Sequence, residues 1–273
     1  MKTTPSNGLV FVFRDPYLYT GQWTLARNHI NARDAWLDSG RRGCYIELME
    51  PIVRAVFFDV DGVLLDSLAA HLQICRDKAI EYGLPVAVPS PSEFKEMIRR
   101  GVPISPMERF FLAVGFPEDQ AKQADLEYRN EFQARYPLAP FLGVDRMLES
   151  LGATGIPLGI VTSNTLPNIR AGLGSLLDAF DRDKLFAHDT RPGLSKADTL
   201  VEAVSSLGLS PMELLYVGDQ PSDLSAAHHA GVSFLAATYG WGFAEDDELG
   251  VAKAHDVSEV THHILDRCAI IVP

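Results

Sequence analysis

The stretch FFDVDGVLLDS, residues 57 to 67, runs from an apolar segment directly into acidic side chains. Residues 54 to 60 are rich in β-branched and aromatic side chains, which is typical of a central parallel strand buried on both faces. In open α/β sheets, ligands bind in the crevice outside the carboxyl ends of the strands. We therefore expect Asp59 and Asp61 to lie at the floor of a binding crevice.

The residues after this strand predict a sharp turn into a helix. Gly62 permits the turn, because glycine tolerates backbone conformations that other residues avoid. Asp66 and Ser67 suit the N-cap of the following helix. Carboxylates gathered this closely repel each other unless a cation or a reaction offsets their charge. The segment predicts a catalytic strand end, with an acidic loop and a capping aspartate as the alternative.

Composition narrows the class of protein. The chain has 273 residues and a formal net charge of −12, which argues against a nucleic-acid partner but leaves small anionic substrates open. Cys44, Cys75 and Cys268 are scattered and odd in number, so they predict neither a disulfide framework nor a zinc site. The sequence has no apolar stretch approaching the roughly 18 residues of a membrane span. We expect a cytoplasmic protein without a membrane partner; the oligomeric state stays open.

The spacing of the predicted elements divides the chain into three parts. Residues 1–50 show little periodicity beyond a possible helix at 23–37, and we expect an extension of unknown role. Between Asp61 and the next strand lie far more residues than the dozen or so that a βα crossover minimally needs. Helical spacing from Leu68 onward, broken by Gly and Pro, predicts an inserted helical cap domain over 68–138. The core domain then comprises residues 51–67 and 139–273.

Strands and helices alternate after the predicted cap. We expect strands at 156–162, 184–187, 214–218 and 232–236, with helices at 144–151, 167–178, 196–207, 222–229 and 257–268. Alternation of this kind predicts an α/β fold, a doubly wound parallel sheet with helices on both faces.

Further polar side chains stand at the same edge of the predicted sheet. Residues 162–164, Thr162, Ser163 and Asn164, follow the second strand, and their hydroxyl and amide groups could hold phosphate oxygens or simply cap a helix. Lys196 opens a helix, where its charge opposes the helix dipole unless an anion lies nearby. Asp219 and Asp223 follow the fourth strand, so two more carboxylates reach this edge.

The four segments together resemble the motifs of the haloacid dehalogenase-like superfamily. Asp-x-Asp-Gly-x-x-x-Asp-Ser at 59–67 is similar to the first motif, and Thr162 to the second. Lys196 matches the third, although the commoner Lys-Pro is replaced by Lys-Ala, and Gly-Asp-x-x-x-Asp at 218–223 matches the fourth. The resemblance implies a Rossmann-like core with a helical cap and places the chain in a branch with phosphoglycolate phosphatases and β-phosphoglucomutases.

The resemblance also implies a reaction. In this family the counterpart of Asp59 is a nucleophile that forms an aspartyl-phosphate, and that of Asp61 is the general acid and base. Mg²⁺ binds the counterparts of Asp59, the backbone carbonyl of Asp61, Asp219 and Asp223, while that of Lys196 neutralises the reacting anions. We expect a Mg²⁺-dependent phosphatase that acts on a small phosphorylated metabolite, of the phosphoglycolate or sugar-phosphate type.

Two other functions stay open. His71 matches a position found in β-phosphoglucomutase-like phosphotransferases as well as in phosphatases. A receiver-like phospho-acceptor without enzymatic activity is disfavoured by the large cap and by Asp61. In the cap, Arg99 and Arg100 could grip a second anionic group of the substrate or lie at a solvated helix end. Residues 239–242, Tyr-Gly-Trp-Gly, resemble phosphoglycolate phosphatase-like members or form an ordinary turn.

Overall fold

The computed structural model describes residues 52–268, apart from the side chains of Gln133 and Ala134. The expectations for residues 1–50, including the helix at 23–37, lie outside the described residues. None of the helices in the described part is both long and apolar enough to cross a membrane.

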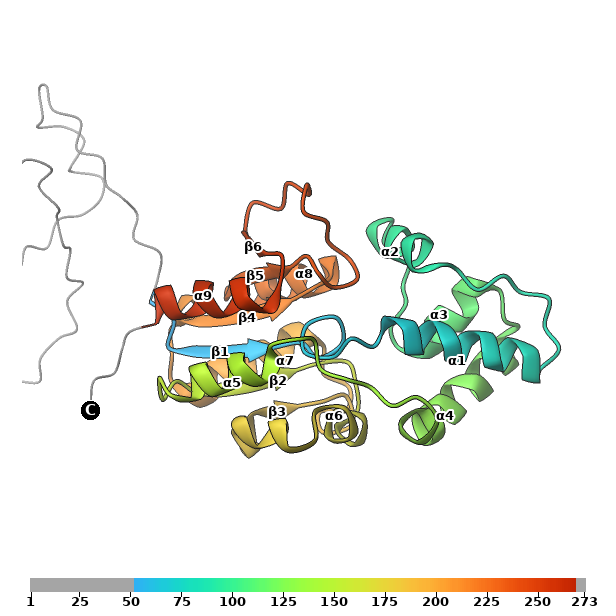
Figure 1. The fold of residues 1–273 in the computed structure, drawn as a ribbon, viewed down its shortest axis with the longest axis horizontal. Coiled ribbons are helices and arrows are strands. Elements are labelled where there is room, and N and C mark those ends of the chain that lie inside the picture. Colours follow the sequence, from blue (N-terminus) through green and yellow to red (C-terminus); the bar gives the residue numbers. More distant parts are fainter. Residues whose placement is uncertain (1–51, 269–273) are drawn as a thin grey trace, which may run out of the picture. The chain divides into compact units, whose positions relative to one another are not determined.

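A six-stranded parallel sheet forms the centre of the described chain, as the sequence predicts (Figure 1). Its strands, in the spatial order β3-β2-β1-β4-β5-β6, are β1 (Ala55–Phe58), β2 (Leu158–Val161), β3 (Leu185–Phe186), β4 (Leu214–Gly218), β5 (Ser233–Ala237) and β6 (Ala252–Ala254). From β1 the chain adds β2 and β3 on one side and then β4, β5 and β6 on the other, which is the doubly wound arrangement. The sequence did not predict β6, because its Ala-Lys-Ala segment lacks β-branched and aromatic residues.

Helices cover both faces of this sheet. One apolar cluster joins Val56 and Phe58 of β1 to α5 (Val144–Gly152), α6 (Leu166–Leu173) and α9 (Val257–Arg267). A second cluster joins Ala55 and Phe57 to α7 (Lys196–Leu207) and α8 (Pro221–Ala230). Alternate residues of β1 thus face opposite layers, and all four are fully buried, as expected for a central strand.

The predicted helix at 167–178 is shorter than expected. The α-helix α6 ends at Leu173, and residues Gly174–Ala179 continue as a 3₁₀-helix. Gly174 has φ +55°, a conformation that ends the α-helical hydrogen-bond ladder and that glycine adopts at little cost.

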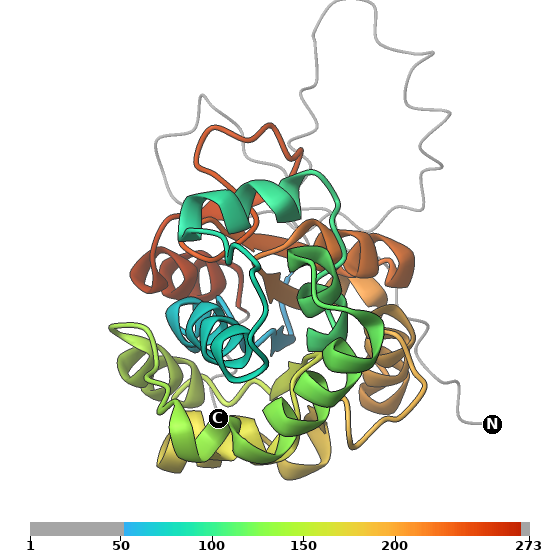
Figure 2. The same cartoon turned by 90° about the vertical axis from the view of Figure 1, so that its right-hand side faces the viewer.

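Four helices inserted between β1 and α5 pack on a cluster of their own: α1 (Leu68–Glu81), α2 (Pro91–Arg99), α3 (Met107–Val114) and α4 (Glu118–Arg135). Figure 2, viewed from the side of these helices, shows them in front of the strands. Trp241, from the loop after β5, joins their apolar cluster. We propose that this unit is the cap, with the boundaries 68 and 138 expected from the sequence.

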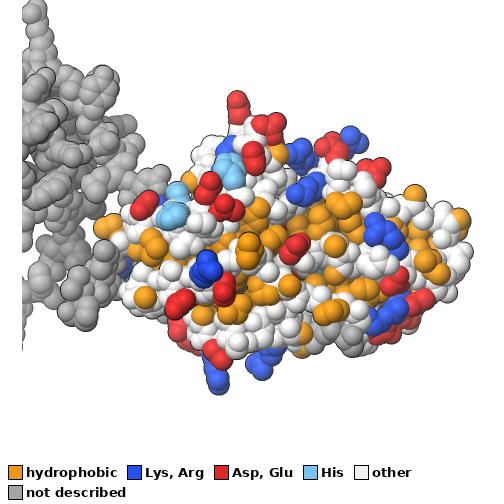
Figure 3. All heavy atoms as spheres, in the orientation of Figure 1, with side chains coloured by type: hydrophobic (Ala, Val, Ile, Leu, Met, Phe, Trp, Pro, Cys, Tyr) orange, Lys and Arg blue, Asp and Glu red, His pale blue; other side chains and the backbone are white. Residues whose placement is uncertain are grey.

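The surface of the described residues is of mixed charge. On the face drawn in Figure 3, lysine and arginine side chains are dispersed among acidic and hydrophobic ones rather than gathered in one patch. A nucleic-acid site needs clustered basic side chains, so this face offers no such site.

Candidate active site

A lysine and two buried aspartates meet at the carboxyl ends of the central strands. Lys196 Nζ donates to Asp59 Oδ2 at 2.7 Å and to Asp223 Oδ1 at 2.6 Å. Asp59 follows β1, Asp223 lies in the first turn of α8, and Lys196 is the first residue of α7. A Ser195–Asp198 capping box fixes the start of α7. The positive charge of Lys196 lies at the N-terminal end of α7, where the helix dipole disfavours it, and two carboxylates compensate for this.

The electrostatics of this group depend on mutual compensation. Burial alone would lower the pKa of Lys196, but the charges of Asp223 and Asp59 outweigh it and raise that pKa well above its usual range. Burial raises the pKa of Asp223, which the ammonium of Lys196 partly counteracts. Lys196 therefore stays protonated beside Asp59 at any physiological pH.

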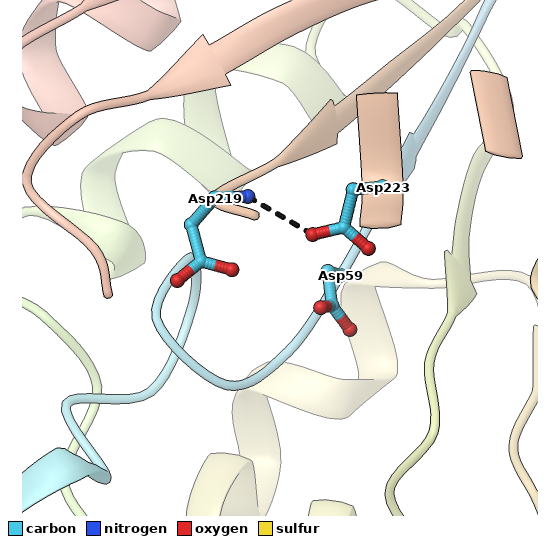
Figure 4. Close-up of side chains that lie close together, drawn as sticks. All are labelled: Asp59, Asp219 and Asp223. Atoms are coloured by element: carbon cyan, nitrogen blue, oxygen red, sulfur yellow. Dashed lines mark hydrogen bonds between the residues drawn. The ribbon is translucent and has the colours of Figure 1, made fainter. Parts of the chain in front are cut away.

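Asp219 completes a cluster of three buried carboxylates (Figure 4). One oxygen each of Asp59, Asp219 and Asp223 lie within 4.8 Å of one another. Burial, and then the charges of Asp223 and Asp59, raise the pKa of Asp219 well above its usual range. Its Oδ1 is buried and has no hydrogen-bond partner among the described residues.

The donors of this cluster fit a divalent cation. Buried polar atoms are rarely left without a partner, and carboxylate oxygens are the ligands that Mg²⁺ prefers. Asp219 Oδ1 and Asp59 are the direct donors that the arrangement offers. Each Asp59 oxygen accepts a single hydrogen bond and keeps a lone pair, whereas each Asp223 oxygen accepts two. Asp223 Oδ1 accepts from Lys196 and Tyr216 Oη, and Oδ2 accepts from the backbone N–H of Asp219 at 3.2 Å and of Gln220 at 3.0 Å. Asp223 therefore orients the loop that carries Asp219.

The loop after β5 holds Asp219 from the other side. The backbone N–H of Trp241 donates to Asp219 Oδ2 at 2.7 Å. A Cβ atom on Gly240 would lie 2.4 Å from Asp219 Cβ and 2.5 Å from the carbonyl oxygen of Gly62. Only glycine fits at position 240. From the sequence, residues 239–242 could be interpreted only as a family resemblance or a turn, so the contact with Asp219 was missed. The glycines on both sides of Trp241 were the available signal of a close approach between backbone segments.

Asp61 is held apart from the three-carboxylate cluster. Its Oδ1 accepts from Ser67 Oγ at 2.6 Å, and its Oδ2 accepts from Asn164 Nδ2 at 2.8 Å. Ser67 occupies the N-cap of α1, but its side chain makes no cap hydrogen bond. The expected capping role of Ser67 was therefore wrong: its hydroxyl is used to fix Asp61.

The predicted phosphate-binding residues line the same pocket as Asp59 and Lys196. Thr162 is 6% exposed, and its Oγ1 accepts from the backbone N–H of Asn164 at 3.2 Å. Ser163 is exposed. The end of β2 thus presents hydroxyl and amide groups beside the Asp59–Lys196 pair.

His71 reaches the pocket from α1, with both ring nitrogens engaged. Its Nδ1 lies 2.8 Å from the backbone carbonyl oxygen of Ser67, and its Nε2 lies 3.2 Å from Tyr128 Oη. Because a carbonyl only accepts hydrogen bonds, Nδ1 carries the hydrogen and, in the neutral ring, Nε2 accepts from Tyr128. The structure thus brings His71 to the pocket, where it positions Tyr128.

The structure does not bring Arg99 and Arg100 to the pocket. Arg99 Nη2 lies 3.7 Å from Asp247 Oδ1, and Arg100 Nε donates to Glu96 on the same helix at 2.7 Å. Both side chains thus have other partners near the end of α2, which fits the alternative of a solvated helix end.

Helix α4 contributes three polar cap side chains to the lining of the pocket, Asp125, Tyr128 and Arg129, beside residues from α1, α2, α3 and the segment before α3. Sequence reasoning missed these three. The available signal was their i, i+3, i+4 spacing, which places all three on one face of a helix.

Comparison with known proteins places the chain among hydrolases. A family model described as haloacid dehalogenase-like hydrolase matches residues 56–237. A phosphoglycolate phosphatase from Synechococcus elongatus is 30% identical, with 73% of this chain and 90% of that protein covered. An N-acetylmuramic acid 6-phosphate phosphatase from Pseudomonas putida is 29% identical, with 71% and 87% covered.

The fold has matching solved structures. A haloacid dehalogenase-like hydrolase from Streptococcus pneumoniae superimposes with a TM-score of 0.63 at 27% identity. The match covers 77% of this chain and 98% of that one.

Proposed function

The chain belongs to the haloacid dehalogenase-like hydrolase family and is a phosphatase, and we propose that it hydrolyses a small phosphorylated metabolite with Mg²⁺ through a phosphoryl group on Asp59. One observation carries the proposal: a buried carboxylate, Asp59, lies 2.7 Å from a lysine ammonium and beside an unpartnered buried oxygen of Asp219. The site thus joins a nucleophile to two places where positive charge can balance a phosphoryl group.

Asp59 is the proposed nucleophile. Its Oδ1 accepts from the backbone N–H of Val60 at 2.8 Å and its Oδ2 from Lys196, so the carboxylate is fixed in direction. An Asp59 oxygen forms a bond to phosphorus while the bond between phosphorus and the leaving oxygen breaks. Asp61 gives that oxygen a proton. Water then attacks phosphorus, Asp61 takes the water's proton, and the Asp59–phosphorus bond breaks to release phosphate.

Asp61 is well placed for both proton transfers. Ser67 and Asn164 each hold one of its oxygens, which fixes the carboxyl group inside the pocket that holds Asp59. Because neither neighbour is charged, the group is oriented without being locked into an ion pair. Thr162, Ser163 and Lys196 would hold the phosphate oxygens during transfer.

Mg²⁺ would be held by Asp59, Asp219 and the backbone carbonyl of Asp61, with Asp223 acting through its hydrogen bonds to the Asp219 loop. When bound, it supplies positive charge that lets an anionic nucleophile approach an anionic substrate. A cytoplasmic location stays a prediction; the free cysteines Cys75 and Cys268 fit a reducing compartment.

The test is phosphate release from a panel of phosphomonoesters, with and without Mg²⁺, by the wild type and by Asp59→Asn. We expect turnover that requires both Mg²⁺ and Asp59. Interconversion of hexose phosphates without net phosphate release would instead support a phosphotransferase. Turnover that persists in Asp59→Asn would contradict the assignment of the nucleophile.

A further inference from the structure

Asp125 and Arg129 form an ion pair in the wall of the pocket opposite the catalytic carboxylates. Arg129 Nη2 lies 2.7 Å and Nε 2.9 Å from the same oxygen, Asp125 Oδ2. The other oxygen of Asp125, Oδ1, and Arg129 Nη1 have no hydrogen-bond partner among the described residues. Asp125 is only 7% exposed, and both residues line the pocket. Oδ1 is therefore available mainly to a molecule bound in that pocket.

The lysine and the arginine that line the pocket are both paired with carboxylates. The Arg129 guanidinium is already neutralised by Asp125, and the Lys196 ammonium by Asp59 and Asp223. Of the other described side chains that line the pocket, only His71 and His188 could carry a positive charge, and both ring nitrogens of His71 are already engaged by Ser67 and Tyr128.

Negative charge, by contrast, extends across the pocket. Burial, and then the charges of Asp61 and Asp125, raise the pKa of Tyr128, which lines the pocket with both of them, well above its usual range. A substrate carrying a second anionic group beyond its phosphate would meet these two carboxylates. An anionic group that accepted from the open Arg129 Nη1 would lie beside the Asp125 carboxylate, which already neutralises the guanidinium, and the repulsion between the two anions disfavours it.

We propose that Asp125 and Arg129 recognise the leaving group of the substrate and select an uncharged, hydroxyl-bearing one, of the sugar or polyol phosphate type, over a carboxylate-bearing one such as phosphoglycolate. A hydroxyl group matches the open atoms of the pair, because it donates to Asp125 Oδ1 and accepts from Arg129 Nη1. The inference rests on the proposed phosphatase function, and it narrows that function to one substrate class.

The position of the pair on one helix supports this role. Asp125 and Arg129 are four residues apart on α4, so their geometry is internal to that helix and is kept in any movement of the cap relative to the core. Tyr128, between them in sequence, is fixed by His71. The recognition group therefore moves as one unit with α4.

The experiment compares kcat/KM for a hexose 6-phosphate and for phosphoglycolate in the wild type and in Asp125→Asn, with p-nitrophenyl phosphate as a substrate that reports phosphatase activity alone. The wild type should prefer the hexose phosphate. In Asp125→Asn the freed guanidinium should shift the ratio toward phosphoglycolate by roughly tenfold or more, since hydrogen bonds to charged groups contribute the most. A fall in folded protein alone would lower both values equally and leave the ratio unchanged.

Glu118→Gln is the matched control. Glu118 and Lys122 form the same i, i+4 ion pair on the same helix, but they are 72% and 53% exposed. The substrate ratio should stay at the wild-type value in this variant. A wild-type preference for phosphoglycolate, or an unchanged ratio in Asp125→Asn, would overturn the inference while hydrolysis of p-nitrophenyl phosphate still upheld the phosphatase. Failure to hydrolyse all three substrates would overturn both.

Discussion

At the scale of single residues, the site depends on buried charges that compensate one another. Asp59 is 3% exposed and Asp223 is fully buried, and both depend on Lys196 for their only cationic partner among the described residues. Removing one member of a buried ion pair leaves an uncompensated charge, which costs more than the pair itself contributes. Lys196 therefore acts on stability as well as on chemistry.

Lys196→Met tests this double role. We expect the free energy of unfolding to fall by about 3–5 kcal/mol, since the methionine leaves two buried carboxylates unpaired, and phosphate release to fall by about 10²–10³-fold. Chemical denaturation and phosphate-release assays measure the two effects. Lys122→Met, which removes an exposed ammonium, is the control. Wild-type stability in Lys196→Met would contradict this account of the buried charges.

Gly240→Ala tests how the loop after β5 holds Asp219. The added methyl group would lie 2.4 Å from Asp219 Cβ, so the carboxylate must move. We expect the Mg²⁺ concentration for half-maximal activity to rise by roughly tenfold or more, as is typical when the groups that orient a metal ligand are disturbed. Gly152→Ala, where a Cβ meets nothing within 4 Å, is the control. An unchanged Mg²⁺ requirement would exclude a role of this contact in metal binding.

The sequence predicted the chemical residues better than their supporting contacts. Asp59, Lys196, Asp219 and Asp223 stand at strand or helix ends, so their convergence follows from the order of elements along the chain. The Ser67–Asp61 hydrogen bond depends on how the turn after β1 closes, which residue type does not reveal. The local pattern predicted that the Ser67 hydroxyl would cap α1, but it donates to Asp61 instead.

At the scale of elements, a cluster of charged side chains joins helices α1 and α4 within the proposed cap. Lys78 of α1 is 1% exposed, and its Nζ donates to Glu127 of α4 at 2.6 Å and to Glu81 at 2.8 Å. Tyr82 Oη also donates to Glu127, at 2.9 Å. The periodicity of both helices predicted their positions along the chain but not this contact, because pairing of two helix faces is a long-range property.

The cluster makes cap stability depend on pH. Burial would raise the pKa of Glu127, but hydrogen bonds from Gln123, Lys78 and Tyr82 outweigh it and lower that pKa from 4.5 to about 2. A carboxylate with a lowered folded-state pKa stabilises the fold above its unfolded value and loses that contribution as the pH falls. We expect Glu127 to contribute fully above pH 4.5 and progressively less toward pH 2.

Denaturation at a series of pH values, followed by circular dichroism, measures this contribution. Glu127→Gln should be less stable than the wild type at neutral pH, and the difference should shrink between pH 4.5 and pH 2. The exposed Glu118→Gln should show a much smaller difference at every pH. A difference between Glu127→Gln and wild type that does not depend on pH would refute the electrostatic origin.

At the scale of the whole molecule, the described part contains the complete set of proposed catalytic residues. The sheet, the inserted helices and the pocket all lie within residues 52–268, and the family match covers residues 56–237. The order of strands and helices predicted this architecture, because alternation along the chain leaves few topologies open. The short strand β6 was missed, since its pairing with β5 supplies what its residue types do not.

We propose that residues 1–48 are not needed for the core to fold. The unit Glu50–Pro273 contains every residue of the proposed mechanism. A chain that begins at Met49 should keep the melting temperature and the kcat/KM of the full chain, as measured by calorimetry and phosphate release. Loss of folding in the shortened chain would show that the first residues belong to the core.

The central claim, a phosphoryl group carried by Asp59, has one most direct test. An acyl phosphate is reduced by borohydride to the corresponding alcohol, so a reaction quenched during turnover with Mg²⁺ and then reduced should contain homoserine at position 59. Peptide mass spectrometry should find it in the wild type and not in Asp59→Asn. Homoserine at another aspartate, or none at position 59 while phosphate is being released and the trapped fraction is measurable, would contradict the account.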